Sequence, residues 1–216
     1  MGGGGGGLRF LAFAPDYGPV LAQDPARSAD ASNGALPELA AARREVEEIG
    51  RRYRPGEKKI YLGPDASKEN VERDPLIADR VHFAGHGLVD EEHPENSALV
   101  LSDGPLRVSD IFNLELKADL VVLSACKTAG KQVTGEGLVG LARAFLYAGS
   151  PSVVVTLWQV VDSPTSDLMN GFYENLDRSV DKAEALRQAK IGLIRRKGRL
   201  ALPYYWAPFV LVGKPR

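Results

Sequence analysis

The sequence is poor in the residues that build disulfide frameworks and metal clusters. Its 216 residues include one cysteine and three histidines. One cysteine cannot form an internal disulfide or a multi-cysteine zinc site, so this cysteine usage fits a reducing compartment. No stretch approaches the roughly 18 consecutive apolar residues that span a bilayer, and no signal peptide is recognisable. These absences predict a soluble, cytoplasmic protein.

An excess of charge of either sign is missing as well. Lysine and arginine together number 27 and aspartate and glutamate 28, which leaves a formal net charge of −1 at pH 7. Bulk charge therefore gives no reason to expect nucleic acid or an anionic membrane as a partner, and we expect neither. The hydrophobic share of 44% and the charged share of 25% are those of a globular protein with a sizeable core.

The first seven residues are a methionine followed by a glycine run. Such a run cannot pack, so we interpret residues 1–7 as an artificial addition or a flexible leader outside the fold. The length suits one or two domains of about 100–200 residues. Because neither an internal repeat nor a linker is visible in the remainder, we expect residues 8–216 to form a single domain.

Short apolar runs alternate with amphipathic stretches along the chain. Strands are predicted at 8–14, 58–62, 79–84, 98–101, 118–125, 151–157 and 207–212. Helices are predicted at 37–52, 66–73, 136–147, 164–176 and 181–196, with Ser67 capping the second. Strands separated by helices of this length indicate right-handed βαβ units and an α/β fold. Its mostly parallel sheet is covered by helices on both faces.

Three of the predicted strands end in residues with unusual chemistry. His86, between two glycines, follows 79–84; Cys126 follows 118–125; Trp158 and Asp162 follow 151–157. In an open parallel sheet, ligands bind in a crevice beyond the carboxyl ends of the strands. We therefore expect these residues to face one crevice. The thiolate of a cysteine is a nucleophile that needs a base or a cation beside it, which makes Cys126 and His86 a candidate dyad.

Each of these residues also has a plain structural interpretation. A lone cysteine at the end of an apolar strand is more often a buried small hydrophobe, and a histidine in a glycine-rich turn is as often structural as catalytic. Trp158 is expected as a pocket wall or a core residue. His82 alternates with apolar neighbours and is expected to pack against a helix, whereas His93, before a proline, is expected in an exposed loop. Spacing alone leaves both interpretations open.

Six blocks of the sequence resemble, in the same order, those of the CHAT domain family, caspase-like domains often attached to tetratricopeptide repeats. They cover roughly residues 36–213. The blocks are 81–87 (VHFAGHG, against HFATHG), 123–129 (LSACKTA, against LSACNTA), 135–149, 151–162 (PSVVVTLWQVVD, against PSVVVTLWQVDD), 185–189 and 205–213. Any one block is a weak signal, but six in order are a strong one.

The resemblance implies a caspase–haemoglobinase-like three-layer α/β fold, related to caspases and separase, with a mostly parallel six-stranded sheet. By position, His86 and Cys126 form the dyad, and the backbone N–H groups of Gly87 and Cys126 bind the oxyanion. Asp162, with Trp158 and Ser124, lines a substrate pocket that favours arginine or lysine. Lys127 replaces the asparagine of the block, and Val161 replaces an acid, which leaves one carboxylate for the pocket.

The function that follows from the resemblance is that of a cysteine endopeptidase acting on protein or peptide substrates, without a metal or a cofactor. We also expect a sensor repeat module or another regulatory partner outside this chain. Two alternatives stay open. One is a catalytically silent caspase-like module that binds a partner protein; the other is acyl transfer to, or hydrolysis of, a small molecule.

Overall fold

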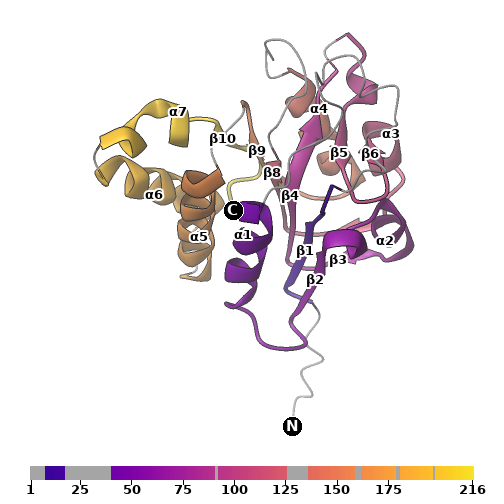
Figure 1. The fold of residues 1–216 in the computed structure, drawn as a ribbon, viewed down its shortest axis with the longest axis horizontal. Coiled ribbons are helices and arrows are strands. Elements are labelled where there is room, and N and C mark those ends of the chain that lie inside the picture. Colours follow the sequence, from indigo (N-terminus) through magenta and orange to yellow (C-terminus); the bar gives the residue numbers. More distant parts are fainter. Residues whose placement is uncertain are drawn as a thin grey trace.

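The computed structural model describes residues 8–17, 40–90, 92–125, 136–158, 162–178, 181–196 and 198–216. These residues build an eight-stranded sheet whose main path runs β10-β9-β8-β4-β1-β2 (Figure 1). The strands of the path are β1 (Phe10–Ala14), β2 (Lys58–Leu62), β4 (Arg80–Leu88), β8 (Leu120–Ala125), β9 (Ser152–Thr156) and β10 (Phe209–Gly213). All neighbours on this path are parallel except β9 and β10. The predicted mostly parallel sheet of six strands is confirmed.

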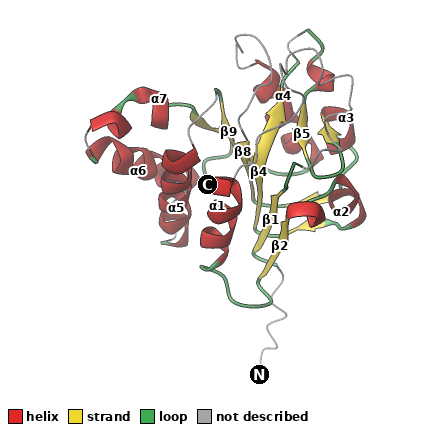
Figure 2. Ribbon diagram, viewed as in Figure 1, coloured by secondary structure: helices red, strands yellow, loops and turns green. Residues whose placement is uncertain are grey.

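Helices cover both faces of the sheet, which gives the predicted three layers (Figure 2). One face packs against α1 (Ala40–Gly50), α5 (Asp162–Asp177) and α6 (Lys182–Arg195). The other packs against α2 (Lys68–Arg73), α3 (Val108–Ile111) and α4 (Glu136–Ala148). Ser67 caps α2 as predicted, since its side chain accepts a hydrogen bond from the N–H of Asn70.

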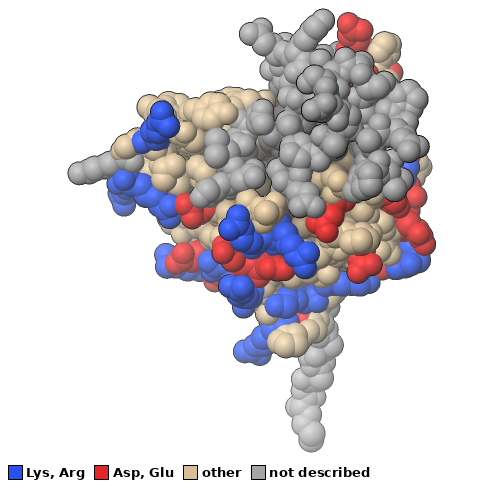
Figure 3. Space-filling view, in the orientation of Figure 1, with Lys and Arg blue, Asp and Glu red and all other residues tan. Residues whose placement is uncertain are grey.

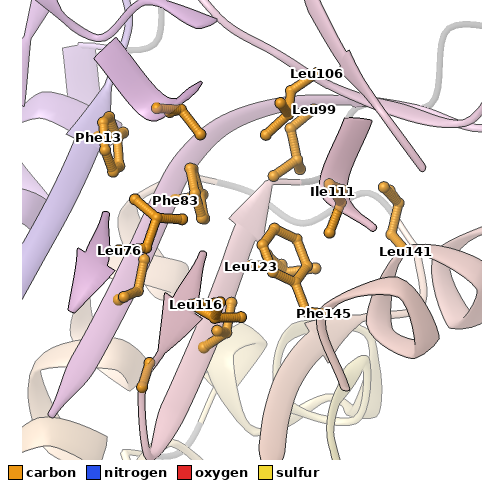
Figure 4. Close-up of a cluster of buried hydrophobic side chains, with 14 of the residues drawn as sticks. Phe13, Leu76, Phe83, Leu99, Leu106, Ile111, Leu116, Leu123, Leu141 and Phe145 are labelled. Carbon is orange, nitrogen blue, oxygen red and sulfur yellow. The ribbon is translucent and has the colours of Figure 1, made fainter. Parts of the chain in front are cut away.

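The two cores follow from the period-two alternation of the strands. In β1, Phe10 and Ala12 face α1 and α5, whereas Phe13 faces the opposite core. In β4 and β8, Phe83 and Leu123 belong to that same opposite core, where Phe145 of α4 packs against Phe83 (Figure 4). Strands buried on both faces explain the continuous apolar runs in the sequence.

Several short elements were not predicted from the sequence. They are β3 (Leu76–Ile77), β6 (Pro105–Arg107), β7 (Leu116–Lys117), α7 (Pro203–Trp206) and the 3-10 turns η3 (Gly63–Asp65), η4 (Pro94–Asn96) and η5 (Gly198–Ala201). β6 pairs with β5 (Ala98–Val100), and β5 pairs antiparallel with the end of β4. β3 pairs with β7 outside the main sheet. Elements this short carry too few residues for a periodic signal.

The predicted end of the strand before His86 is wrong. We expected the strand to stop at Ala84 and the chain to turn through Gly85, His86 and Gly87, whereas β4 continues to Leu88. The physical reason is β5, which supplies a second strand partner: His86 pairs with Val100 and Gly87 with Leu99. Gly85 and Gly87 do not have positive φ angles, so the two glycines do not form a sharp turn.

Gly149 ends α4 in a conformation that other residues rarely adopt, with φ at 127°. A β-carbon at this position would lie 2.6 Å from the carbonyl oxygen of Leu116. We expect Gly149→Ala to lower the free energy of unfolding by about 1–3 kcal/mol. The strain of a positive φ angle and the clash with the Leu116 carbonyl both contribute to this loss.

The matched control is Gly192→Ala, at an exposed position inside α6 where a β-carbon has no atom within 4 Å. The free energy of unfolding of that variant is expected to rise by up to about 1 kcal/mol, because alanine has a higher helix propensity than glycine. Urea denaturation of both variants measures the difference, and a stabilised Gly149→Ala protein would contradict the assigned backbone conformation.

Candidate functional site

The carboxyl ends of β4 and β8 lie side by side. The parallel ladder between them pairs Ala84 with Ser124 and Gly85 with Ala125. The next residues along the chain are His86 and Cys126. Cys126 lies outside the described residues, so its side chain is not placed. The register nevertheless brings the residue before the predicted base next to the residue before the predicted nucleophile.

His86 is held inside the protein. Its side chain is fully buried, and its backbone N–H donates to the hydroxyl oxygen of Tyr17 at 2.7 Å. The imidazole and the Tyr17 ring lie 4.5 Å apart between centroids, tilted by 44°. A narrow apolar hollow adjoins His86 and is lined by Phe13, Phe83 and Leu99, among others. The ring of Tyr17, which follows β1, therefore covers part of a fully buried imidazole.

The structure describes some of the other predicted site residues in full and others only in part. Gly87 is buried in β4, Ser124 is half-buried in β8, and Trp158 is half-buried just after β9. Trp158 donates its indole N–H to the carbonyl oxygen of Tyr204 in α7, at 3.2 Å, which ties the end of β9 to that helix. Asp162 is the first residue of α5, and its side chain lies outside the described part of the chain.

Tyr17 is the residue near the candidate site that the sequence reasoning missed. It lies three residues after β1 ends, just beyond the strand predicted at 8–14. The signal that could have found it is an aromatic residue just beyond the carboxyl end of a parallel strand. Ligand-binding sites of open parallel sheets lie at these strand ends.

A second histidine of β4, His82, is part of a buried polar network. Its Nε2 lies 2.9 Å from a carboxylate oxygen of Glu45 in α1, and its Nδ1 lies 3.0 Å from the hydroxyl of Tyr173 in α5. All three residues are at most 2% exposed. Burial raises the pKa of Tyr173 well above its ordinary value, so this hydroxyl keeps its proton and is able to donate it to Nδ1 of His82. His82 packs against helices, as expected, but through hydrogen bonds.

Basic and acidic side chains are interspersed on the face of the molecule drawn in Figure 3. Among the described residues, no three histidine, cysteine, aspartate or glutamate side chains are grouped closely enough to hold a metal ion. None of the helices in the described ranges is long and apolar enough to cross a membrane. His93 is exposed, as expected, and lies near Asp90.

The model of the CHAT domain family matches residues 11–214, nearly the whole chain. The chain belongs to the CHAT domain family. The matched range includes every strand of the main sheet path except the first residue of β1. The family predicted from six ordered sequence blocks is thereby confirmed.

Curated relatives of this CHAT domain are much longer proteins. Tetratricopeptide repeat protein 28 from mouse is 35% identical over 108 residues, and the human protein is 32% identical over the same length. Each match covers 50% of this chain but only 4% of the relative. The similarity therefore concerns a small part of each relative.

Solved structures with the same fold include a bacterial protease. The Arg-specific cysteine proteinase gingipain R matches with a TM-score of 0.59 and 13% identity, over 96% of this chain and 46% of that one. A complex of the pro- and mature domains of RgpB from Porphyromonas gingivalis matches with a TM-score of 0.55 and 13% identity, over 96% and 47% of the two chains. At this identity the likeness shows the fold alone, and it confirms the caspase–haemoglobinase fold.

Proposed function

We propose that this CHAT domain is a cysteine endopeptidase with His86 and Cys126 as its catalytic dyad. The observation that carries the proposal is the pairing of Gly85 with Ala125, because it brings the two chain positions just before the dyad into neighbouring places on adjacent strands. The intact pair of residue types supports it further, since a thiol next to an imidazole is the arrangement that forms a reactive thiolate.

In this proposal His86 takes the proton of the Cys126 thiol while the sulfur attacks the carbonyl carbon of the scissile peptide bond. The resulting oxyanion collapses to a thioester, and His86 returns the proton to the departing amine. Water then hydrolyses the thioester, releases the acid product and restores the thiol. The protein supplies a base, a nucleophile and donors for the oxyanion.

The direction of the Gly87 N–H supports its role as an oxyanion donor. Successive residues of a strand direct their backbone groups to opposite sides. The His86 N–H points toward Tyr17, which follows β1, so the Gly87 N–H points to the side of β8, along which the chain continues to Cys126. A donor on that side is where a tetrahedral oxyanion beside the cysteine would need it, and such a donor contributes about 3 kcal/mol in acyl-transfer enzymes.

Substrate preference is the second part of the proposal. We infer that Asp162, at the start of α5, pairs with an arginine or lysine before the scissile bond, with Trp158 and Ser124 beside it. Trp158 has a fixed place because its indole is bonded to α7. A carboxylate that meets a guanidinium or an ammonium forms charge-assisted hydrogen bonds that a neutral side chain cannot replace.

The test is covalent labelling of the full chain with peptidyl acyloxymethyl ketones, followed by mass spectrometry of the modified residue. We expect labelling at Cys126, about tenfold or more faster with arginine or lysine before the warhead than with norleucine. Cys126→Ala is expected to remove labelling, and Asp162→Asn to remove the preference. No labelling of the wild type would argue against the peptidase. Equal labelling rates with arginine, lysine and norleucine before the warhead would argue against the preference for a basic residue.

One observation favours a second candidate, a catalytically silent module that binds a partner protein. The His86 side chain is fully buried, whereas a base must reach its substrate. This candidate would be supported by wild-type protein that is labelled by none of the acyloxymethyl ketones but binds a repeat protein. The curated relatives are named as tetratricopeptide repeat proteins, so a repeat module is the partner that we propose for residues 8–216, in either case.

A further inference from the structure

The Tyr17 hydroxyl bridges two strands at one end of the ladder between them. It accepts the hydrogen bond of the His86 N–H at 2.7 Å and donates to the carbonyl oxygen of Val100 over a longer 3.5 Å. His86 in β4 and Val100 in β5 are opposite each other in the antiparallel register. The hydroxyl thus links the two strands at the residue that carries the proposed base.

Gly85 leaves the space that this hydroxyl occupies. A β-carbon at Gly85 would overlap the Tyr17 hydroxyl oxygen and would lie 3.4 Å from Cγ of Pro15. The resembling sequence block has a threonine at this position, and this chain has glycine. Tyrosine at 17 and glycine at 85 therefore fit each other, since a side chain at 85 and the hydroxyl cannot share the space.

The ring of Tyr17 limits the imidazole as well. The two rings are 4.5 Å apart, Tyr17 is 8% exposed, and His86 is fully buried. A close-packed interior leaves few alternative rotamers to a side chain whose face is covered by another ring. Tyr17 therefore contacts His86 at two places, the backbone through its hydroxyl and the imidazole through its ring.

We propose that Tyr17 is a positioning residue for His86, and that it fixes the orientation of the imidazole. Its catalytic consequence rests on the proposed function, but the positioning itself does not. Tyr17 is not proposed to contact the substrate. It acts through His86, with Gly85 as the residue that admits its hydroxyl.

The experiment combines two measurements on the full chain. The first is the NMR signal of the His86 ring, assigned by its loss in His86→Gln. The second is labelling by the arginine acyloxymethyl ketone, separated into the inactivation rate constant and the inhibitor constant. The variants are Tyr17→Phe, Tyr17→Leu, Gly85→Ala and the double variant Tyr17→Phe/Gly85→Ala. Tyr147→Phe, at a tyrosine that is 76% exposed, is the matched control.

We expect Tyr17→Phe and Gly85→Ala to shift the His86 signal and to lower the inactivation rate constant by about 10- to 100-fold, because small misplacements of a base have effects of this size. The inhibitor constant is expected to stay unchanged. Tyr17→Leu, which also loses the ring, is expected to shift the signal furthest. The double variant is expected to match Tyr17→Phe instead of adding the two losses, since the new methyl group fills the vacated space.

A His86 signal that is the same in Tyr17→Phe, Tyr17→Leu and the wild type would overturn the proposal, whatever the labelling shows. So would losses in the double variant that simply add. If the wild type is not labelled at all, the peptidase proposal fails, while the NMR comparison still decides whether Tyr17 positions His86. A folded, labelled Tyr17→Phe protein whose inactivation rate constant equals that of the wild type would also count against it.

Discussion

Replacing His86 with alanine is expected to slow the alkylation of Cys126 by the arginine acyloxymethyl ketone by about 10²–10⁴-fold, the range that general acid–base groups contribute. Without an imidazole beside it, the thiol is largely protonated at neutral pH and lacks a group that can take its proton. The measurement is the second-order inactivation rate constant of the full chain, with the site of modification confirmed by mass spectrometry.

Two controls separate chemistry from folding in this experiment. His93→Ala removes an exposed histidine near Asp90 and is expected to leave the rate unchanged. His86→Gln keeps most of the buried volume and is expected to be as slow as His86→Ala. A folded His86→Ala protein that is labelled as fast as the wild type would remove His86 from the mechanism.

The largest loss of stability is expected from Glu45→Ala, at about 3–5 kcal/mol. The change removes the carboxylate that accepts from His82 inside the core, so a polar ring nitrogen is left buried without its acceptor, and a cavity is added. Urea denaturation followed by circular dichroism measures it as a lower midpoint at constant slope. Glu45→Gln keeps an acceptor oxygen and is expected to lose less.

Glu47→Ala is the matched control, because it removes a glutamate from the same helix. Its carboxylate is 39% exposed and pairs with Arg43 one turn away. Exposed pairs of this kind contribute about 0.3–0.5 kcal/mol, so this variant is expected to stay close to the wild type. Equal losses in Glu45→Ala and Glu47→Ala would mean that the network of His82, Glu45 and Tyr173 does not stabilise the fold.

The fold could be predicted from the sequence because the strands inside its main sheet path are apolar on both faces, as in β1 and β9. Residues 58–62 were predicted as a strand with the bounds that β2 has, and the long apolar run before Cys126 contains β8. The elements that were missed, such as β6 and α7, are three or four residues long. Their conformation is set by partners far away in the sequence, which a local pattern does not contain.

The residues of the candidate site stay a prediction, and the backbone around His86 differs from the one expected. The order of blocks indicated His86 and Gly87, and the structure locates both on β4. The expected turn at Gly85 was wrong because glycine favours turns only where the chain has no strand partner, and β5 supplies one. Tyr17 could not be assigned to His86 from the sequence, since nothing local links positions so far apart.

The contacts that hold His86 also bear on the order of events in folding. Tyr17 and His86 are separated by 69 residues along the chain, and Tyr17 and Val100 by 83. Contacts of such long range form only after the entropy of closing large loops has been overcome, which places them late in folding. In a partly folded chain these contacts to His86 are therefore expected to be missing, and the proposed dyad would form only once the whole domain has folded.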